Sequence, residues 1–172
     1  MKNKEIMQIA LDRGSSDHAS LIRGIGQLLS FQVVNMANGT HILQAGAIPV
    51  RAGKICLVTS SNGKRWVIPK GLIEPGQSPG ETALQEAWEE AGLVGVLDPD
   101  PIGSFLYDKW CGTCHVTVFI MEVSAVAGDW PERRLRQRDW VTLVGALQRL
   151  DDAGLCDILR LTFGKRKQPL KS

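Results

Sequence analysis

Three glutamates at positions 86, 89 and 90 are close enough in the sequence to act on one common group. If this segment is helical, a rotation of about 100° per residue places all three carboxylates on one face. Like charges at these spacings repel, and a hard divalent cation with oxygen ligands, Mg²⁺ or Mn²⁺, would relieve the repulsion. The same spacing is compatible with an ordinary solvated acidic face, so helix geometry alone leaves both interpretations open.

A helix that begins near Ser78 or Pro79 and ends at Gly92 would carry these glutamates. Proline is favoured in the first turn of a helix, and glycine is favoured just after the last turn. The side of the helix away from the glutamates is apolar and is expected to pack against the core; it comprises Leu84, Ala87, Trp88 and Ala91.

The segment before this helix is rich in glycine and proline. It contains Pro69-Lys70-Gly71 and, three residues later, Glu74-Pro75-Gly76. Glycine lets the backbone approach other groups closely, so a carbonyl here could add a metal ligand and the amides could meet phosphate oxygens. Loop and helix together predict a site for a metal ion and a phosphorylated ligand.

Residues 71–93 resemble the Nudix box, a 23-residue pattern of glycine, glutamates and apolar residues at fixed spacing. The positions in register are Gly71, Glu86, Ala87, Glu89, Glu90, Gly92 and Leu93. The resemblance implies an α+β fold, the Nudix α/β/α sandwich with a mixed sheet between helices. It also implies cleavage of a pyrophosphate bond with Mg²⁺ or Mn²⁺. Glu86, Glu89 and Glu90 would be both catalytic and metal-ligating, with the Gly71 carbonyl as a further ligand and one carboxylate as the base.

Two positions depart from the pattern of the box. Gln77 stands where the pattern has Glu, and Gln85 stands where it has Arg. In the family this arginine is thought to orient the metal-binding glutamates. Because one negative and one positive charge are lost together, we hypothesise a paired replacement, in which amide hydrogen bonds between Gln77 and Gln85 substitute for an ion pair.

The similarity extends over roughly residues 44 to 150 and is greatest to the branch of diphosphoinositol polyphosphate and diadenosine polyphosphate hydrolases. It implies a polyphosphorylated small-molecule substrate, for which Arg51, Lys70 and His115 are the expected binding residues. The family often adds a carboxylate from outside the box. Glu132 is the first candidate for it and Glu122 the second.

The rest of the chain predicts strands and helices without a regular βαβ repeat, as in α+β proteins. Strands are expected over residues 45–50, 54–59, 65–69, 94–97, 102–110, 114–126 and 140–143, and helices over 145–150 and 155–161. Ala52-Gly53 is expected to turn the chain, and Asn62-Gly63 predicts a type I′ hairpin turn. Residues 1–40 are interpreted as an extension of uncertain structure, 41–163 as the hydrolase domain and 164–172 as a basic tail.

Composition bounds the classes of function. A net charge of +2 on 172 residues does not favour nucleic-acid binding. Apolar runs are too short to span a membrane, and no signal peptide is evident, so we expect a cytoplasmic protein with reduced cysteines. A homodimer remains open.

The run Cys111-Gly112-Thr113-Cys114-His115 matches the pattern of c-type haem attachment, which would require export. Two free thiols near a hairpin turn are the favoured interpretation, with a redox switch as the alternative. For the chain as a whole, the alternatives to a working hydrolase are a Nudix-fold ligand sensor with weakened catalysis and, less favoured, an RNA-binding protein.

Overall fold

The computed structural model describes residues 33–36, 39–109 and 112–164. Nine strands form one sheet: β1 (Val33–Met36), β2 (Gly39–Arg51), β3 (Lys54–Thr59), β4 (Trp66–Val67), β5 (Lys70–Leu72), β6 (Leu93–Leu97), β7 (Gly103–Lys109), β8 (Gly112–Val126) and β9 (Arg138–Val141). The helices are α3 (Pro79–Ala91), α4 (Leu143–Arg149) and α5 (Ala153–Phe163). The basic tail, apart from Gly164, lies outside the described residues, as does Cys111.

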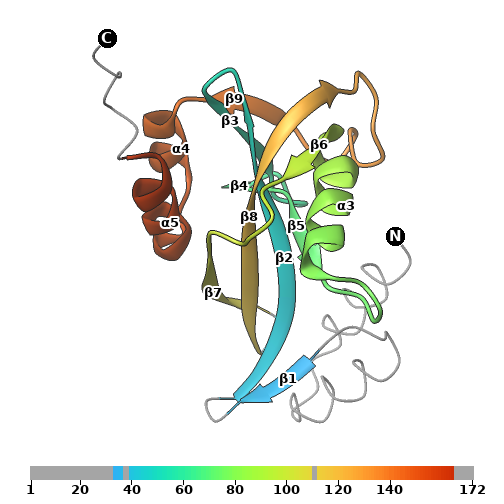
Figure 1. The fold of residues 1–172 in the computed structure, drawn as a ribbon, viewed down its shortest axis with the longest axis vertical. Coiled ribbons are helices and arrows are strands. Elements are labelled where there is room, and N and C mark those ends of the chain that lie inside the picture. Colours follow the sequence, from blue (N-terminus) through green and yellow to red (C-terminus); the bar gives the residue numbers. More distant parts are fainter. Residues whose placement is uncertain (1–32, 37–38, 110–111, 165–172) are drawn as a thin grey trace.

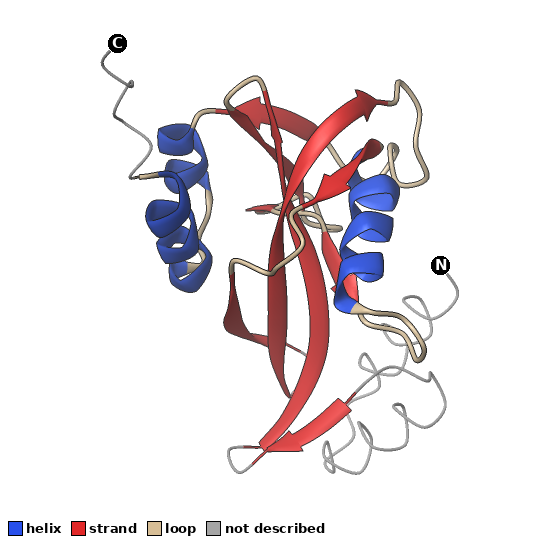
Figure 2. Cartoon of the chain, viewed as in Figure 1, coloured by secondary structure: helices blue, strands red, loops and turns tan. Residues whose placement is uncertain are grey.

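The sheet is mixed, because its two long central strands, β2 and β8, run parallel while every other pairing is antiparallel. Its main order is β4-β3-β2-β8-β6, with β5 also on β2 and β7 also on β8. Helix α3 covers one face, and α4 and α5 cover the other (Figures 1 and 2). This arrangement confirms the predicted α+β fold with a mixed sheet between helices.

Each face of the sheet has its own apolar core. Under α3 the core is built from small helix residues and from strand residues such as Val58, Phe119 and Met121. Under α4 and α5 it contains larger side chains, among them Leu57 and Leu159. Cys56 and Cys114 are buried in strands. Within the described residues, no helix has both the length and the apolarity needed to cross a membrane.

The ends of α3 follow directly from the sequence. Ser78 is the N-cap, and its hydroxyl accepts a hydrogen bond from the backbone N–H of Glu81. The Glu81 carboxylate accepts in turn from the backbone N–H of Ser78 at 2.8 Å, which completes a capping box. Gly92 closes the helix with a φ of 63°, a left-handed conformation that favours glycine. The predicted limits of this helix are confirmed.

The prediction for the apolar side of α3 was only half right. Ala87 and Ala91 are buried against the sheet, but Leu84 and Trp88 are 37% and 41% exposed. The helix is rotated so that two of its glutamates, together with its alanines, face the sheet. Only small side chains fit under a helix that approaches the strands this closely, and the two large residues therefore lie on its flank.

Of the two predicted turns, the one at Ala52-Gly53 is confirmed and the one at Asn62-Gly63 differs in type. In the β2–β3 hairpin both Ala52 and Gly53 have positive φ, 49° and 73°. In the pair Asn62-Gly63 only Gly63 does, with a φ of 71°, so the predicted type I′ turn is wrong there. Instead, the Asn62 side chain accepts hydrogen bonds from the Ser60 hydroxyl and from a backbone N–H, which stabilises a longer loop.

Candidate functional site

Glu86 lies against the backbone of β5, in the middle of the sheet. Its side chain is buried, and the strand residue beside it is Gly71, which pairs with Ala45 of β2. A Cβ added at Gly71 would overlap the Glu86 carboxylate. The glycine is therefore required for close approach, and the structure brings together two residues that the sequence predicted to share a site.

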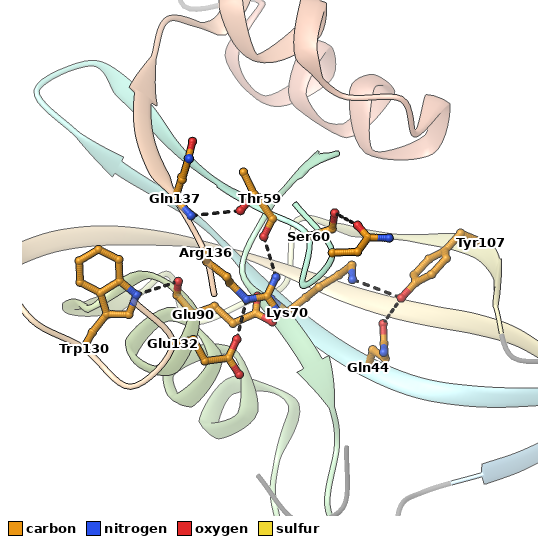
Figure 3. A network of polar contacts seen from close by, with 11 residues as sticks. Gln44, Thr59, Ser60, Lys70, Glu90, Tyr107, Trp130, Glu132, Arg136 and Gln137 are labelled. Carbon is orange, nitrogen blue, oxygen red and sulfur yellow. Dashed lines mark hydrogen bonds and ion pairs between the residues drawn. The ribbon is translucent and has the colours of Figure 1, made fainter. Parts of the chain in front are cut away.

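Glu90, one turn further along α3, is the most buried of the three glutamates at 2% exposed. Its carboxylate accepts a hydrogen bond from the backbone N–H of Lys70 at 3.1 Å and forms an ion pair with the Arg136 guanidinium. Arg136 comes from the loop between β8 and β9 and is itself buried (Figure 3). A buried charge is tolerated when it is paired and hydrogen-bonded, as it is here.

Arg136 contacts two further groups around this pair. It donates to the Thr59 carbonyl at 2.7 Å and to the Glu132 carboxylate at 2.6 Å, while the backbone N–H of Glu132 donates to the Glu89 carbonyl at 3.0 Å. Glu132, predicted as an extra carboxylate, thus contacts the same guanidinium as Glu90 (Figure 3). In the sequence, Arg136 belongs to a cluster of arginines at positions 133, 134, 136 and 138 that would suit an anionic ligand. Its spacing of four residues from Glu132 was the available signal, but its tertiary partner could not be read from it.

Glu89 is the partly exposed member of the three. Its Oε1 accepts a hydrogen bond from Gln85 Nε2 at 3.0 Å, and Gln85 Oε1 accepts from Gln77 Nε2 at 2.7 Å. The amide hydrogen bond hypothesised between Gln77 and Gln85 is therefore present. These neutral amides stand where the family pattern has a glutamate and an arginine, and Gln85 also donates to the Glu89 carboxylate.

On the opposite side of β5 lies a second polar group, built around Lys70. Alternation along the strand directs the Lys70 side chain away from the face of Gly71. Its Nζ lies 3.2 Å from the Tyr107 hydroxyl, which donates to Gln44 Oε1 at 2.8 Å. Burial lowers the pKa of Lys70, an effect that the nearby Glu90 carboxylate opposes, and burial raises the pKa of Tyr107. Tyr107 and Gln44 could not be predicted as partners of Lys70, since only the strand pairing brings them to it.

His115 and Arg51 lie further from the carboxylates. His115 pairs with Leu43 across β8 and β2, and its ring centroid is 6.3 Å from that of His41. Arg51 is exposed at the far end of β2. It is six residues beyond Ala45, the partner of Gly71, and hence about 20 Å along the strand.

Glu122, the second candidate for an extra carboxylate, lines a hollow together with Arg51 and Asp98. It is exposed there, at the far end of the central strands, and the structure does not bring it to the glutamates of α3. Of the two candidates, only Glu132 lies beside the carboxylate cluster.

Trp130 and Arg138 form hydrogen bonds to backbone carbonyls at the C-terminal end of α3. The indole N–H of Trp130 donates to the Glu90 carbonyl at 3.2 Å, and the Arg138 guanidinium lies 4.4 Å from the centre of the Trp130 ring. Arg138 also donates to the carbonyls of Ala91 and Ala127. Two of the arginines that the sequence suggested for phosphate recognition, Arg136 and Arg138, thus make intramolecular contacts.

The donor chemistry of this region fits a hard divalent cation. Glu86 and Glu90 present carboxylate oxygens beside the backbone of β5, and Glu89 presents a third carboxylate on the same helix; oxygen ligands of this kind suit Mg²⁺ and Mn²⁺. In the described part of the chain, no three acidic, histidine or cysteine side chains are gathered around one point. The glutamates supply the oxygen ligands that a divalent cation prefers, and they lie on one helix. To bind one ion together, their side chains would have to turn toward a common point.

A family model and several curated proteins match this chain. The model of the NUDIX domain matches residues 40–156. Nudix hydrolase 12, mitochondrial, of Arabidopsis thaliana is 36% identical over 103 residues, which cover 55% of this chain and 51% of that protein. Diphosphoinositol polyphosphate phosphohydrolase 3-beta of Bos taurus is 33% identical over 102 residues, covering 57% and 60%. The chain thus spans about half the length of the curated relatives it matches.

Solved structures show the same fold. The Ap4A hydrolase of C. elegans in a binary complex aligns with a TM-score of 0.56 at 21% identity, over 69% of this chain and 93% of that one. A NUDIX hydrolase from Nitrosomonas europaea aligns with a TM-score of 0.62 at 16% identity, over 75% and 93%. Since the family model covers more than half of the chain and includes all three glutamates, the chain belongs to the Nudix hydrolase family.

Proposed function

We propose that this protein hydrolyses a phosphoric anhydride bond in a polyphosphorylated small molecule, with Mg²⁺ or Mn²⁺ as cofactor. The observation that carries the proposal is the position of Glu86 and Glu90, two buried carboxylates held against the glycine-bearing strand β5. Burying such charges is costly, and a structural role alone would be served by apolar residues. Their retention is explained if they bind a cation.

Glu86, Glu89 and Glu90 would hold the metal, with the Gly71 carbonyl as a further oxygen donor. When bound, the metal supplies neutralisation of phosphate charge and activation of water near neutral pH. The protein residues orient these groups: Arg136 and the Lys70 N–H position Glu90, and Gln85 holds Glu89. In the reaction, water adds to one phosphorus and gives up a proton to one of the carboxylates, the P–O bond of the anhydride breaks, and the departing phosphate takes the electron pair.

The substrate class follows from the relatives and from Lys70. The relatives' names include diphosphoinositol polyphosphate phosphohydrolases, and a structural neighbour is an Ap4A hydrolase. We therefore propose a dinucleoside polyphosphate or a diphosphoinositol polyphosphate. Lys70 is a cation whose backbone N–H donates to Glu90 and whose Nζ contacts the Tyr107 hydroxyl, and with His115 it remains our candidate for phosphate binding. Arg51 is a weaker candidate because of its distance.

The test is release of phosphate or nucleotide from a panel of substrates, with Mg²⁺, with Mn²⁺ and with EDTA. The panel holds diadenosine polyphosphates, nucleoside triphosphates, ADP-ribose and an inositol pyrophosphate. We expect metal-dependent cleavage of one class, and loss of most turnover in Glu89→Gln with little change in folding. Full activity of that variant would show that the metal site is misplaced.

A second candidate, a ligand sensor with weakened catalysis, is favoured by Gln85, which stands where the family pattern has arginine. It predicts that ligands and metal bind while no member of the panel is cleaved. RNA binding has less support, because Arg136 and Arg138 are engaged within the protein. Several relatives are named as mitochondrial or chloroplastic, so the cytoplasmic location stays a proposal.

A further inference from the structure

Three side chains of α3 and one from the loop before it form a continuous chain of hydrogen bonds that ends at Glu89. The Thr82 hydroxyl donates to Gln77 Oε1 at 3.1 Å, Gln77 Nε2 donates to Gln85 Oε1 at 2.7 Å, and Gln85 Nε2 donates to Glu89 Oε1 at 3.0 Å. We refer to Thr82, Gln77, Gln85 and Glu89 as the amide chain. It links the loop before the helix to the helical turn that carries Glu89.

The amide chain has a direction, and the carboxylate sets it. An ionised carboxylate only accepts hydrogen bonds, so Gln85 must present its NH₂ group to Glu89 and its carbonyl oxygen to Gln77. Gln77 must then present its own NH₂ group to Gln85 and its oxygen to the Thr82 hydroxyl. Reversing either amide would place two acceptors face to face. Bonds aligned in this way polarise one another in the same sense.

The position of the amide chain indicates that it orients the Glu89 carboxylate and contributes little to the stability of the fold. Gln85 is exposed, so solvent competes for its hydrogen bonds and their contribution to folding is small. The bond to Glu89 nevertheless fixes which of the two carboxylate oxygens is engaged. Among the described residues, the Oε2 atom of Glu89 accepts no hydrogen bond.

Glu89 and Glu90 differ in the charge of the side chain that holds each carboxylate. Glu90 faces the guanidinium of Arg136, whereas Glu89 is held by a neutral amide. The amide of Gln85 donates a hydrogen bond to Glu89 without adding a charge beside it. Neutral positioning leaves the full charge of Glu89 to the ligand.

We propose that Gln85 is a positioning residue for the metal site, which holds Glu89 by one oxygen through the amide chain and leaves the other oxygen to a divalent cation. This inference rests on the proposed function, because it assigns Glu89 to metal binding. It extends that function by making the affinity for the cation depend on the direction of two neutral amides.

The test uses Gln77→Glu, which should reverse the amide of Gln85. The new carboxylate at position 77 would accept from Gln85 Nε2, so Gln85 would turn its oxygen toward Glu89 and Glu89 would lose its donor. We expect Mn²⁺ binding, measured by electron paramagnetic resonance on the full chain, to weaken about tenfold. A plain charge effect has the opposite sign, since an added carboxylate near the site would strengthen cation binding.

Two further variants complete the design. Gln85→Leu removes the donor without adding charge and should weaken Mn²⁺ binding by a similar factor. The double change Gln77→Glu with Gln85→Arg supplies donors to both carboxylates, and it should recover Mn²⁺ binding relative to Gln77→Glu alone. Gln148→Leu, on the exposed surface of α4, is the matched control and should leave Mn²⁺ binding unchanged.

Melting temperatures in EDTA show whether a variant acts through folding. We expect Gln77→Glu and Gln85→Leu to melt close to the wild type, with weaker Mn²⁺ binding. Unchanged or tighter Mn²⁺ binding in Gln77→Glu would overturn the inference and leave the proposed function standing. No Mn²⁺ binding and no hydrolysis by the wild type would overturn the proposed function and this inference together.

Discussion

Replacing Gly71 with alanine tests how closely the site depends on the contact between β5 and α3. The added Cβ would overlap the Glu86 carboxylate, and even the more distant oxygen, Oε2, would lie 2.8 Å from it. Ordinary van der Waals contact begins near 3.4 Å, so this oxygen must move by at least about 0.6 Å and the nearer one by more.

The displaced group is the end of a flexible side chain, which determines the expected phenotype. Glu86 can rotate away with a modest loss of stability, but it then leaves the position in which it would bind metal. Because a misplacement of about 1 Å can lower a rate about 100-fold, we expect kcat to fall about 10- to 100-fold in Gly71→Ala. The assay is metal-dependent hydrolysis of whichever panel substrate the wild type cleaves, together with thermal melting in EDTA.

Gly80→Ala is the matched control for this experiment. Its Cβ would lie 3.6 Å from Leu97 Cδ1, an ordinary contact, and alanine is favoured in the first turns of a helix. We expect it to keep wild-type turnover and to be at least as stable. If Gly71→Ala folds and hydrolyses the substrate at the wild-type rate, the close approach of Gly71 to Glu86 has no part in catalysis and the reasoning is refuted.

Three other perturbations follow from the contacts described. Arg136→Met leaves the Glu90 carboxylate buried without its cation, so the free energy of unfolding in EDTA should fall by about 3–5 kcal/mol in urea titrations; a loss under 1 kcal/mol would contradict the buried ion pair. Burial raises the pKa of Cys56 from 9.0 to about 12, so the unfolded chain releases this proton at lower pH than the folded one and stability falls as pH rises above 9. Between pH 9 and 10 the wild type should lose about 1 kcal/mol more than Cys56→Ala, and parallel pH profiles would exclude the effect. Ser78→Ala removes the N-cap of α3 and should cost about 1 kcal/mol by thermal melting, whereas an unchanged melting temperature would show that the capping box contributes nothing.

The features that the sequence predicted well are those determined by neighbours in the chain. The limits of α3 follow from Ser78, Pro79 and Gly92, because capping depends on residues within one turn. Helical spacing accounts for Glu86 and Glu90 facing the sheet together, whereas Glu89, predicted to share their face, is partly exposed. Conversely, the exposure of Trp88 could not be predicted, because the rotation of a helix about its axis depends on how closely it approaches the sheet.

The partners of the site were the least predictable part. Arg136 lies 46 residues from Glu90 in the sequence, and only the path of the loop after β8 brings the two together. Tyr107 meets Lys70 across 37 residues through pairings of separate strands. Arg51 shows the reverse error: it is closer in the sequence to Gly71 than Arg136 is, yet it lies at the distant end of β2.

The parallel pairing of β2 with β8 has a consequence for how this protein folds. His41 pairs with Thr113, so the segment that carries β5, α3 and the three glutamates of α3 lies within the loop that this pairing closes. Contacts between residues so far apart form slowly, because the chain must lose entropy before they stabilise it. Helix α3 can form early by itself, but its carboxylates acquire their neighbours only when the two central strands join. In refolding experiments, regain of Mn²⁺ binding should therefore coincide with amide-exchange protection in β2 and β8, and lag behind the appearance of helical circular dichroism.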